Sequence, residues 1–209
     1  METNRLINDD CLIAMNDIPD GSIDTIICDL PYGTTNNRWD SILPFDELWK
    51  HYRRIVKKRG AIVLFSQQPF TAKLVASNID MFKYEWIWEK NNATGFLNAK
   101  HAPMKKHENI CVFSHTAAAP LAKTEAMMCF YPQYRKGKPY FTKCGTSGEN
   151  YGKTKSTPTT NNGENYYPID ILRFDSDKEK LHPTQKPVEL LRYLIRTYTN
   201  EGETVLDSC

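Results

Sequence analysis

An aspartate, a proline and a tyrosine stand together directly after an apolar run, in residues 25–33 (Thr-Ile-Ile-Cys-Asp-Leu-Pro-Tyr-Gly). The Asp29 carboxylate can accept a hydrogen bond from an amino group, and the backbone carbonyls around Pro31 are further acceptors. Tyr32 offers a flat face on which a planar ring can stack. These groups could therefore hold a ring and its exocyclic amine. The same residues are equally compatible with a strand-to-turn junction in which Asp29 caps a backbone amide.

The apolar run predicts a buried strand that ends at Asp29. Ile26, Ile27 and Cys28 are β-branched or small, which suits a strand covered on both faces. Pro31 fixes φ and has no N–H, so the strand cannot continue through it. Asp29 is thus placed at the carboxyl end of a strand, which is where ligands bind in open α/β sheets.

The rest of the chain alternates between strand and helix patterns, which predicts an α/β fold with a mostly parallel sheet. Strands are expected at residues 6–8, 25–28, 61–65, 84–88, 109–114 and 204–206, and helices at 12–15, 45–56, 70–77 and 188–199. From His115 to about Lys180 the sequence is rich in Thr, Asn, Gly, Tyr and Lys without a clear period, which indicates an inserted module. The last strand ends in Asp207 and so repeats the geometry expected at Asp29.

Length and composition are typical of one soluble domain with a smaller insertion. The chain has 209 residues, of which 40% are apolar and 25% charged, and a formal net charge of +2. It has no apolar stretch of about 18 residues and no signal-peptide apolar region at its start, so we expect a cytoplasmic protein with no membrane partner. The six cysteines form no Cys-x-x-Cys pair and have no neighbouring histidine at ligand spacing. That spacing argues against a zinc site and favours reduced thiols.

Basic residues gather between Tyr131 and Thr160, where six of them accompany one acid, Glu149. Aromatic residues and glycines are interleaved with the charges. Because cations meet phosphates and rings can stack on or wedge between bases, this segment is a candidate nucleic-acid contact. The alternative is a solvated surface loop. The six basic residues are Arg135, Lys136, Lys138, Lys143, Lys153 and Lys155.

In their order along the chain, these features resemble the amino-group DNA methyltransferases of the circularly permuted β group, which use S-adenosylmethionine and carry an Asp-Pro-Pro-Tyr signature. Residues 29–32 are similar to that catalytic tetrad, with Leu30 in place of its first proline. Residues 182–187 (His-Pro-Thr-Gln-Lys-Pro) resemble the family's helix-start motif. The segments similar to the family are, in chain order, 8–11, 29–32, 106–110, 182–187 and 205–207.

This resemblance implies a Rossmann-like methyltransferase sheet and methyl transfer to the N6 amine of an adenine that is flipped out of double-stranded DNA. The aspartate that opens the tetrad favours adenine N6, and cytosine N4 is the alternative. For His182 and Lys186 the alternative roles are helix capping and surface charge. By resemblance, the catalytic residues are Asp29, Leu30, Pro31 and Tyr32, and the cofactor-binding residues are Asp10, Asp29, His182, Thr184, Lys186 and Asp207.

The resemblance also divides the chain. Residues 1–114 would form the catalytic part, 115–180 a target-recognition insertion, and 181–209 the start of the cofactor-binding part. Family members continue from the last strand into a glycine-rich loop, whereas this sequence stops at Cys209, so we expect an incomplete cofactor site that binds S-adenosylmethionine weakly or not at all. A non-catalytic DNA-binding remnant is the alternative function. A restriction-modification role and a homodimer are both compatible with the family.

Overall fold

The computed structural model describes residues 4–34, 37, 40–118, 127–143, 157–179, 181–182 and 184–209. The chain forms two compact units. The larger unit consists of Met1–Tyr131 and Asp170–Cys209, and the smaller unit of Pro132–Ile169. The smaller unit therefore falls inside the segment 115–180 predicted as an insertion, while both flanks of that segment belong to the larger unit.

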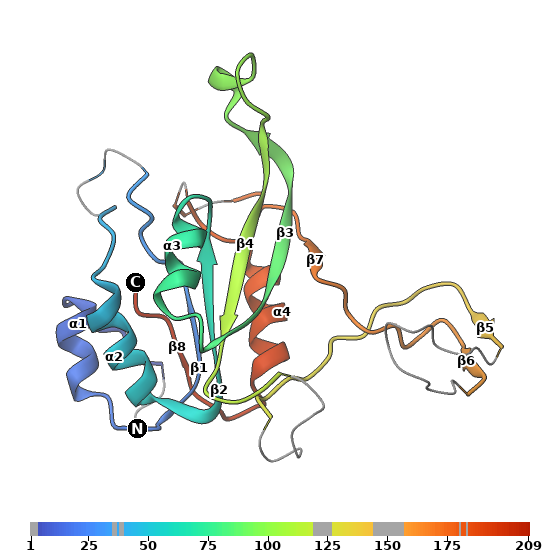
Figure 1. The fold of residues 1–209 in the computed structure, drawn as a ribbon, viewed down its shortest axis with the longest axis horizontal. Helices are drawn as coiled ribbons and strands as arrows, with labels where there is room; N and C mark the ends of the chain where they lie inside the picture. Colours follow the sequence, from blue (N-terminus) through green and yellow to red (C-terminus); the bar gives the residue numbers. More distant parts are fainter. Residues whose placement is uncertain are drawn as a thin grey trace. The chain divides into compact units, whose positions relative to one another are not determined.

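The larger unit is built on a six-stranded sheet with the strand order β7-β3-β4-β2-β1-β8 (Figure 1). Its strands are β1 (Ile23–Cys28), β2 (Val56–Ser66), β3 (Phe82–Thr94), β4 (Lys105–Phe113), β7 (Ile171–Arg173) and β8 (Val205–Leu206). β1 pairs in parallel with β2 and β8, and β3 pairs in parallel with β7. β4 pairs in the antiparallel sense with both β2 and β3, and its pairing with β3 follows from the hairpin that joins the two strands. The prediction of a mostly parallel sheet is confirmed.

Helices cover both faces of this sheet (Figure 1). They are α1 (Cys11–Ala14), η1 (Met15–Asp17), α2 (Phe45–Ile55), α3 (Phe70–Ser77) and α4 (Val188–Tyr198). A further short helix, η2 (Phe96–Asn98), lies in the connection between β3 and β4 and covers neither face. Ile26 and Cys28 of β1 belong to the core under α2 and α3, whereas Ile27 belongs to the core under α4. Successive side chains of β1 are thus buried on opposite faces of the sheet, which is why the end of this strand is apolar throughout. A central sheet with helices on both faces confirms the predicted α/β fold.

None of the described helices is long and apolar enough to cross a membrane. The longest of them, α2 and α4, have 11 residues each.

The sequence prediction was wrong for residues 6–8 and for the segment 115–180, which contains the three strands β5 (Tyr140–Thr142), β6 (Thr159–Asn161) and β7. Residues 6–8 belong to no sheet of the described chain, and Leu6 is 96% exposed. An extended segment becomes a strand only where a neighbour takes up its backbone hydrogen bonds, which a local pattern cannot reveal. Conversely, β7 lies in the segment predicted to be irregular. It has one buried residue, Leu172, which packs in the same core as Trp88 of β3, so its local pattern is too short to recognise.

The smaller unit contains a two-stranded antiparallel sheet of β5 (Tyr140–Thr142) and β6 (Thr159–Asn161). A further antiparallel bridge joins Arg135 and Tyr166. Next to this bridge, Gly137 N donates to Gly163 O at 2.7 Å. Gly163 has φ +93, and a Cβ there would lie 2.6 Å from Gly137 O, so only glycine fits this close approach.

Candidate active site

A cleft of about 1420 Å³ lies at the carboxyl ends of β1 and β8. Its walls are formed by the segments after β1, β2 and β8, the start of α1 and the segment before α4. The fold thereby brings together side chains that are as distant in the sequence as Asp10 and Asp207. All the residues predicted to be catalytic or to bind the cofactor line this cleft, namely Asp10, Asp29, Leu30, Pro31, Tyr32, His182, Thr184, Lys186 and Asp207.

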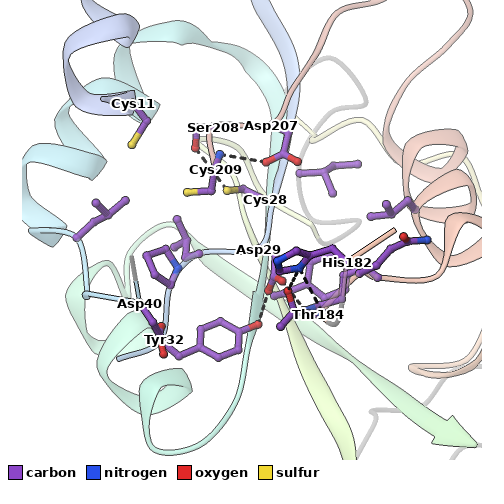
Figure 2. A pocket seen from close by; sticks show the side chains of 18 of the residues that line it. Cys11, Cys28, Asp29, Tyr32, Asp40, His182, Thr184, Asp207, Ser208 and Cys209 are labelled. Atoms are coloured by element: carbon purple, nitrogen blue, oxygen red, sulfur yellow. Dashed lines mark hydrogen bonds and ion pairs between the residues drawn. The ribbon is translucent and has the colours of Figure 1, made fainter. Parts of the chain in front are cut away.

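Both carboxylate oxygens of Asp29 are hydrogen-bonded to side chains in the cleft. The Tyr32 hydroxyl donates to Oδ1 at 2.6 Å, as Figure 2 shows, and Lys186 Nζ donates to Oδ2 at 2.5 Å. The cap alternative requires a backbone amide as the partner, whereas these two partners are side chains. A carboxylate offers about four lone-pair sites, so Asp29 keeps capacity for another donor.

Tyr32 is held in place through its ring as well as its hydroxyl. The ring packs against Phe70 of α3, with 5.1 Å between centroids and 34° between planes. Burial, followed by the nearby charge of Asp29, raises the pKa of the Tyr32 phenol above its ordinary value. The hydroxyl therefore stays protonated and remains a donor to Asp29.

Glu108 of β4 joins Lys186 to Lys90 of β3. Glu108 Oε1 lies 2.5 Å from Lys90 Nζ, and Glu108 Oε2 lies 3.4 Å from Lys186 Nζ. The side chains of these three residues are only 11–16% exposed. The four charges alternate in sign from Lys90 through Glu108 and Lys186 to Asp29, so each is compensated within the chain. This arrangement fixes the ammonium of Lys186 beside Asp29.

Asp40 orders the loop that follows Tyr32. Its side chain accepts the backbone N–H of Gly33 at 2.8 Å and that of Thr34 at 2.9 Å, and the residue is 8% exposed. Gly33 has φ +66, and a Cβ there would lie 3.1 Å from a side-chain carbon of Ile42. A buried carboxylate and a left-handed glycine together set the position of Tyr32.

Asp10 and Asp207 supply carboxylates to another part of the cleft wall. Asp10 Oδ1 accepts the Leu12 N–H at 2.8 Å and so caps α1, and Asp207 Oδ1 accepts the Cys209 N–H at 3.3 Å (Figure 2). Burial, aided by the charge of Asp29, raises the pKa of Asp207. A negative wall of this kind favours a ligand with cationic groups, hydroxyls or amines.

His182 and Thr184 also line the cleft, and both are exposed. His182 Nδ1 lies 2.9 Å from Thr184 Oγ1 and accepts the Thr184 N–H at 3.3 Å (Figure 2). The N–H of Val188, at the start of α4, donates to Asp177 Oδ2 at 3.2 Å. Asp177 is therefore the residue that accepts this N–H, which the capping alternative had assigned to His182. Lys186 points to the two carboxylates of the cleft and is largely shielded from solvent.

The residues predicted to contact DNA belong to the smaller unit. Arg135, Lys136, Lys138 and Lys143 are exposed, whereas Lys153 and Lys155 lie outside the described residues. The Lys136 ammonium lies 3.4 Å from the Glu164 carboxylate, and both side chains are mostly exposed, so their pairing is weak.

Three residues of the site were not among the predicted ones, namely Asp40, Lys90 and Glu108. The sequence offered one indication of Glu108, which lies in the family-like segment 106–110, two residues before the apolar run of a buried strand. For Lys90 and Asp40 it offered none, because their partners are distant in the sequence. Across the described part of the chain, no group of three or more His, Cys, Asp or Glu side chains is arranged to hold a metal ion.

Comparison with known proteins finds a family and several relatives. Residues 23–208 match a family model described as DNA methylase. Type II methyltransferase M.HpaI of Haemophilus parainfluenzae is 25% identical over 216 residues, which cover 97% of this chain and 62% of that protein. DNA adenine methyltransferase YhdJ of Escherichia coli (strain K12) is 26% identical over 226 residues, covering 99% of this chain and 71% of YhdJ. The chain thus spans less than two thirds of the length of M.HpaI.

Solved structures share the fold. The M1.HpyAVI–SAM complex has a TM-score of 0.55 at 20% identity, with 96% of this chain and 80% of the other covered. The cytosine-N4-specific PvuII DNA methyltransferase has a TM-score of 0.60 at 13% identity, with 95% and 71% covered. At these identities the likeness shows the fold alone.

Proposed function

The chain belongs to the DNA methylase family, and we propose that it transfers a methyl group from S-adenosylmethionine to the exocyclic amine of a base in double-stranded DNA. One observation carries the proposal. Asp29, the Leu30 carbonyl and the Tyr32 ring stand together at the end of β1, on the wall of a cleft of about 1420 Å³ that has the volume for a bound nucleoside. The family match alone would leave open which residues act.

The wall of the cleft fits S-adenosylmethionine by its chemistry. Asp10 and Asp207 are acceptors for the amine and hydroxyls of a nucleoside, and Thr184 and Lys186 suit the methionine carboxylate. The raised pKa of Asp207 indicates a carboxylate that is incompletely compensated and would be stabilised by a cationic ligand. When bound, the cofactor supplies a methyl group made electrophilic by its sulfonium.

The target amine would be activated by hydrogen bonds. The Asp29 carboxylate and the Leu30 carbonyl each accept one of its hydrogens, which favours a pyramidal nitrogen with an available lone pair. Tyr32 holds the flipped base by stacking, with its own ring backed by Phe70. Formation of the new C–N bond would be matched by cleavage of the methyl–sulfur bond, whose electron pair would leave with the sulfur as a neutral thioether. Asp29 would stabilise the positive charge on the amine nitrogen until one of its protons passes to solvent.

Lys186 keeps Asp29 in position for this step. Its ammonium and the Tyr32 hydroxyl hold opposite oxygens of the carboxylate, which limits rotation of the carboxyl group. The acceptor is thereby preorganised before the base arrives, and no reorganisation is required during the reaction.

The base is proposed to be adenine, modified at N6. Support comes from the aspartate at the first position of the tetrad and from the relative that is an adenine methyltransferase. The fold does not discriminate, because a cytosine-N4-specific enzyme shares it. Cytosine N4 therefore stays the alternative.

The test is methylation of plasmid DNA by the protein with labelled S-adenosylmethionine at high concentration, because weak binding of the cofactor stays a prediction. Digestion and mass spectrometry of the nucleosides follow. We expect N6-methyladenine. Detection of N4-methylcytosine would support the methyl transfer and identify cytosine as the target base. DNA binding without any methylated nucleoside would contradict the proposal and favour the non-catalytic alternative.

A variant of the acceptor connects this activity to the site. Asp29→Ala should reduce methyl transfer by roughly 100-fold or more, since it removes a preorganised acceptor of the reacting amine. DNA affinity should stay within about twofold, because phosphate contacts position the protein on the duplex. Asp46→Ala, at an exposed position in the first turn of α2, is the matched control. Methyl transfer that persists in Asp29→Ala would rule out this site.

A further inference from the structure

The hairpin between β3 and β4 carries an excess of basic residues. Residues 90–107 contain four lysines and two histidines and no acidic residue. Lys90 pairs with Glu108 and Lys106 with Glu89 at the base of the hairpin, which leaves Lys100 and Lys105 outside the described ion pairs. Of residues 91–107, all except the half-buried Ala93 are exposed. The hairpin extends past the helices that flank the sheet (Figure 1). A long basic projection of this kind fits a polyanionic partner.

Two large apolar side chains occupy the tip of this hairpin. Phe96 is 77% exposed and Leu97 is 94% exposed. The backbone beneath them is ordered by a 3₁₀ turn, in which Asn98 N donates to Gly95 O at 3.0 Å and Ala99 N donates to Phe96 O at 3.1 Å. The tip therefore presents two apolar groups to solvent from a defined turn.

The base of the hairpin forms part of the cleft. Asn91, Asn92 and Thr94 line the same cleft as Asp29, and Lys90 is bonded to Glu108 within it. The tip is thus connected to the site through two paired strands. A ligand that reaches from the cleft along these strands would meet the lysines of the hairpin together with Phe96 and Leu97.

We propose that Phe96 and Leu97 are a wedge that enters the base stack of the duplex beside the target base, while Lys100 and Lys105 contact the flanking phosphates. This inference rests on the proposed function. Flipping a base requires unstacking, and apolar side chains that take the vacated space stabilise the opened duplex. Contacts of this kind would lower the cost of presenting the base to Asp29.

Charge and area favour DNA over a second copy of the chain as the partner. Two apolar side chains fall well short of the roughly 800 Å² per partner that a stable protein interface buries. Lys100 and Lys105 would repel the same residues on the hairpin of another copy, whereas phosphates would attract them.

The test uses Phe96→Ala/Leu97→Ala and two duplex oligonucleotides with the sequence methylated in the activity assay, one fully paired and one with the target base opposite an abasic site. We expect methylation of the paired duplex to fall roughly tenfold or more and that of the pre-opened duplex to fall by less than about threefold. Equal reduction on both duplexes, or no reduction on either, would overturn the proposal. Ile79→Ala, at an exposed isoleucine before β3, should leave both rates unchanged.

A second measurement separates this proposal from the proposed function. 2-Aminopurine at the target position reports unstacking by its fluorescence without any methyl transfer. The wild-type protein should raise the fluorescence and the double variant should not. An equal rise in fluorescence with both proteins would contradict the wedge. A rise with the wild-type protein in the absence of any methyl transfer in the activity assay would contradict the proposed methyltransferase activity and leave the wedge standing. A double variant that changes the oligomeric state and keeps its activity on paired duplex would overturn the wedge and assign the tip to protein contact.

Discussion

Lys186 Nζ lies 2.5 Å from Asp29 Oδ2, and the lysine is the more deeply buried partner, with 11% of its side chain exposed against 34% for the aspartate. The cation is therefore part of the structure around Asp29, held from the other side by Glu108 at 3.4 Å. Because two carboxylates share one shielded ammonium, removal of that ammonium affects both.

Lys186→Met keeps the length and the apolar stem of the side chain but removes the charge. We expect methyl transfer to fall by roughly 10- to 100-fold, because Asp29 is left with one of the two groups that orient it. The free energy of unfolding should fall by about 3 kcal/mol, since Glu108 no longer has the second of its two cationic neighbours. Steady-state kinetics and urea unfolding measure the two effects. Lys178→Met, at an exposed position, is the control, and equal activity of both variants would contradict the role of Lys186.

Asp40→Asn tests the loop after Tyr32. The amide has one carbonyl oxygen, so its two terminal atoms cannot accept both the Gly33 and the Thr34 N–H groups as the two carboxylate oxygens do. We expect the free energy of unfolding to fall by about 1–3 kcal/mol and the KM for DNA to rise, with kcat less affected. Urea unfolding and initial-rate kinetics provide the measurement. A variant with unchanged KM and stability would show that Asp40 does not order the loop.

Alkaline pH should destabilise the larger unit through its buried tyrosines. Burial raises the pKa of Tyr84 to about 12, and the Tyr84 hydroxyl lies 3.0 Å from that of Tyr198. A phenol in the unfolded chain has a pKa of about 10. The folded state therefore retains a proton that the unfolded state releases, so this contribution to stability is complete below pH ~10 and is lost progressively between pH ~10 and ~12.

Tyr84→Phe removes this titration. Its free energy of unfolding should fall less steeply above pH ~10 than that of the wild type, by up to about 1.4 kcal/mol per pH unit. Urea unfolding at several pH values between roughly 8 and 11.5, which span the unfolded pKa, supplies the slopes. Identical slopes for the two proteins would mean that Tyr84 titrates in the folded state as it does in the unfolded chain.

The sequence was sufficient for those parts of the fold that depend on local patterns. α3 and α4 were predicted nearly to the residue because their apolar positions repeat at helical spacing, and β1 because its apolar run ends in a polar tip. Pairing partners were not predictable. Residues 6–8 look like a strand and have no neighbouring strand in the described part of the chain, whereas β7 looks irregular and is a strand because β3 takes up its hydrogen bonds.

The candidate site was predictable only as a set of motifs. Asp29 and Lys186 belong to two separate motifs, and nothing in their spacing shows that they touch. The contacts of Glu108 with Lys90 and Lys186 depend on the register of β3 against β4 and on the start of α4, which are properties of the folded chain. For the same reason the sequence left surface charge open as a role for Lys186, since burial of a lysine becomes evident only when its carboxylate partners are known.

The basic residues of the smaller unit give a prediction about DNA affinity. Lys136 faces Glu164 at 3.4 Å, whereas the Lys138 carbonyl accepts the Tyr166 hydroxyl, which holds the backbone of that lysine in place. Lys136→Ala/Lys138→Ala should weaken binding to duplexes of any sequence and lower the slope of log affinity against log salt by roughly 0.9 for each phosphate that is no longer neutralised. Glu164→Gln should strengthen binding, because it frees Lys136 from its acidic neighbour.

Fluorescence anisotropy with a labelled duplex at several salt concentrations measures the affinity of the wild type and of these two variants. The control is Lys50→Ala, at an exposed position on α2, which should bind DNA like the wild type. If the double variant also binds like the wild type, the basic segment is a solvated surface loop without a role in DNA binding.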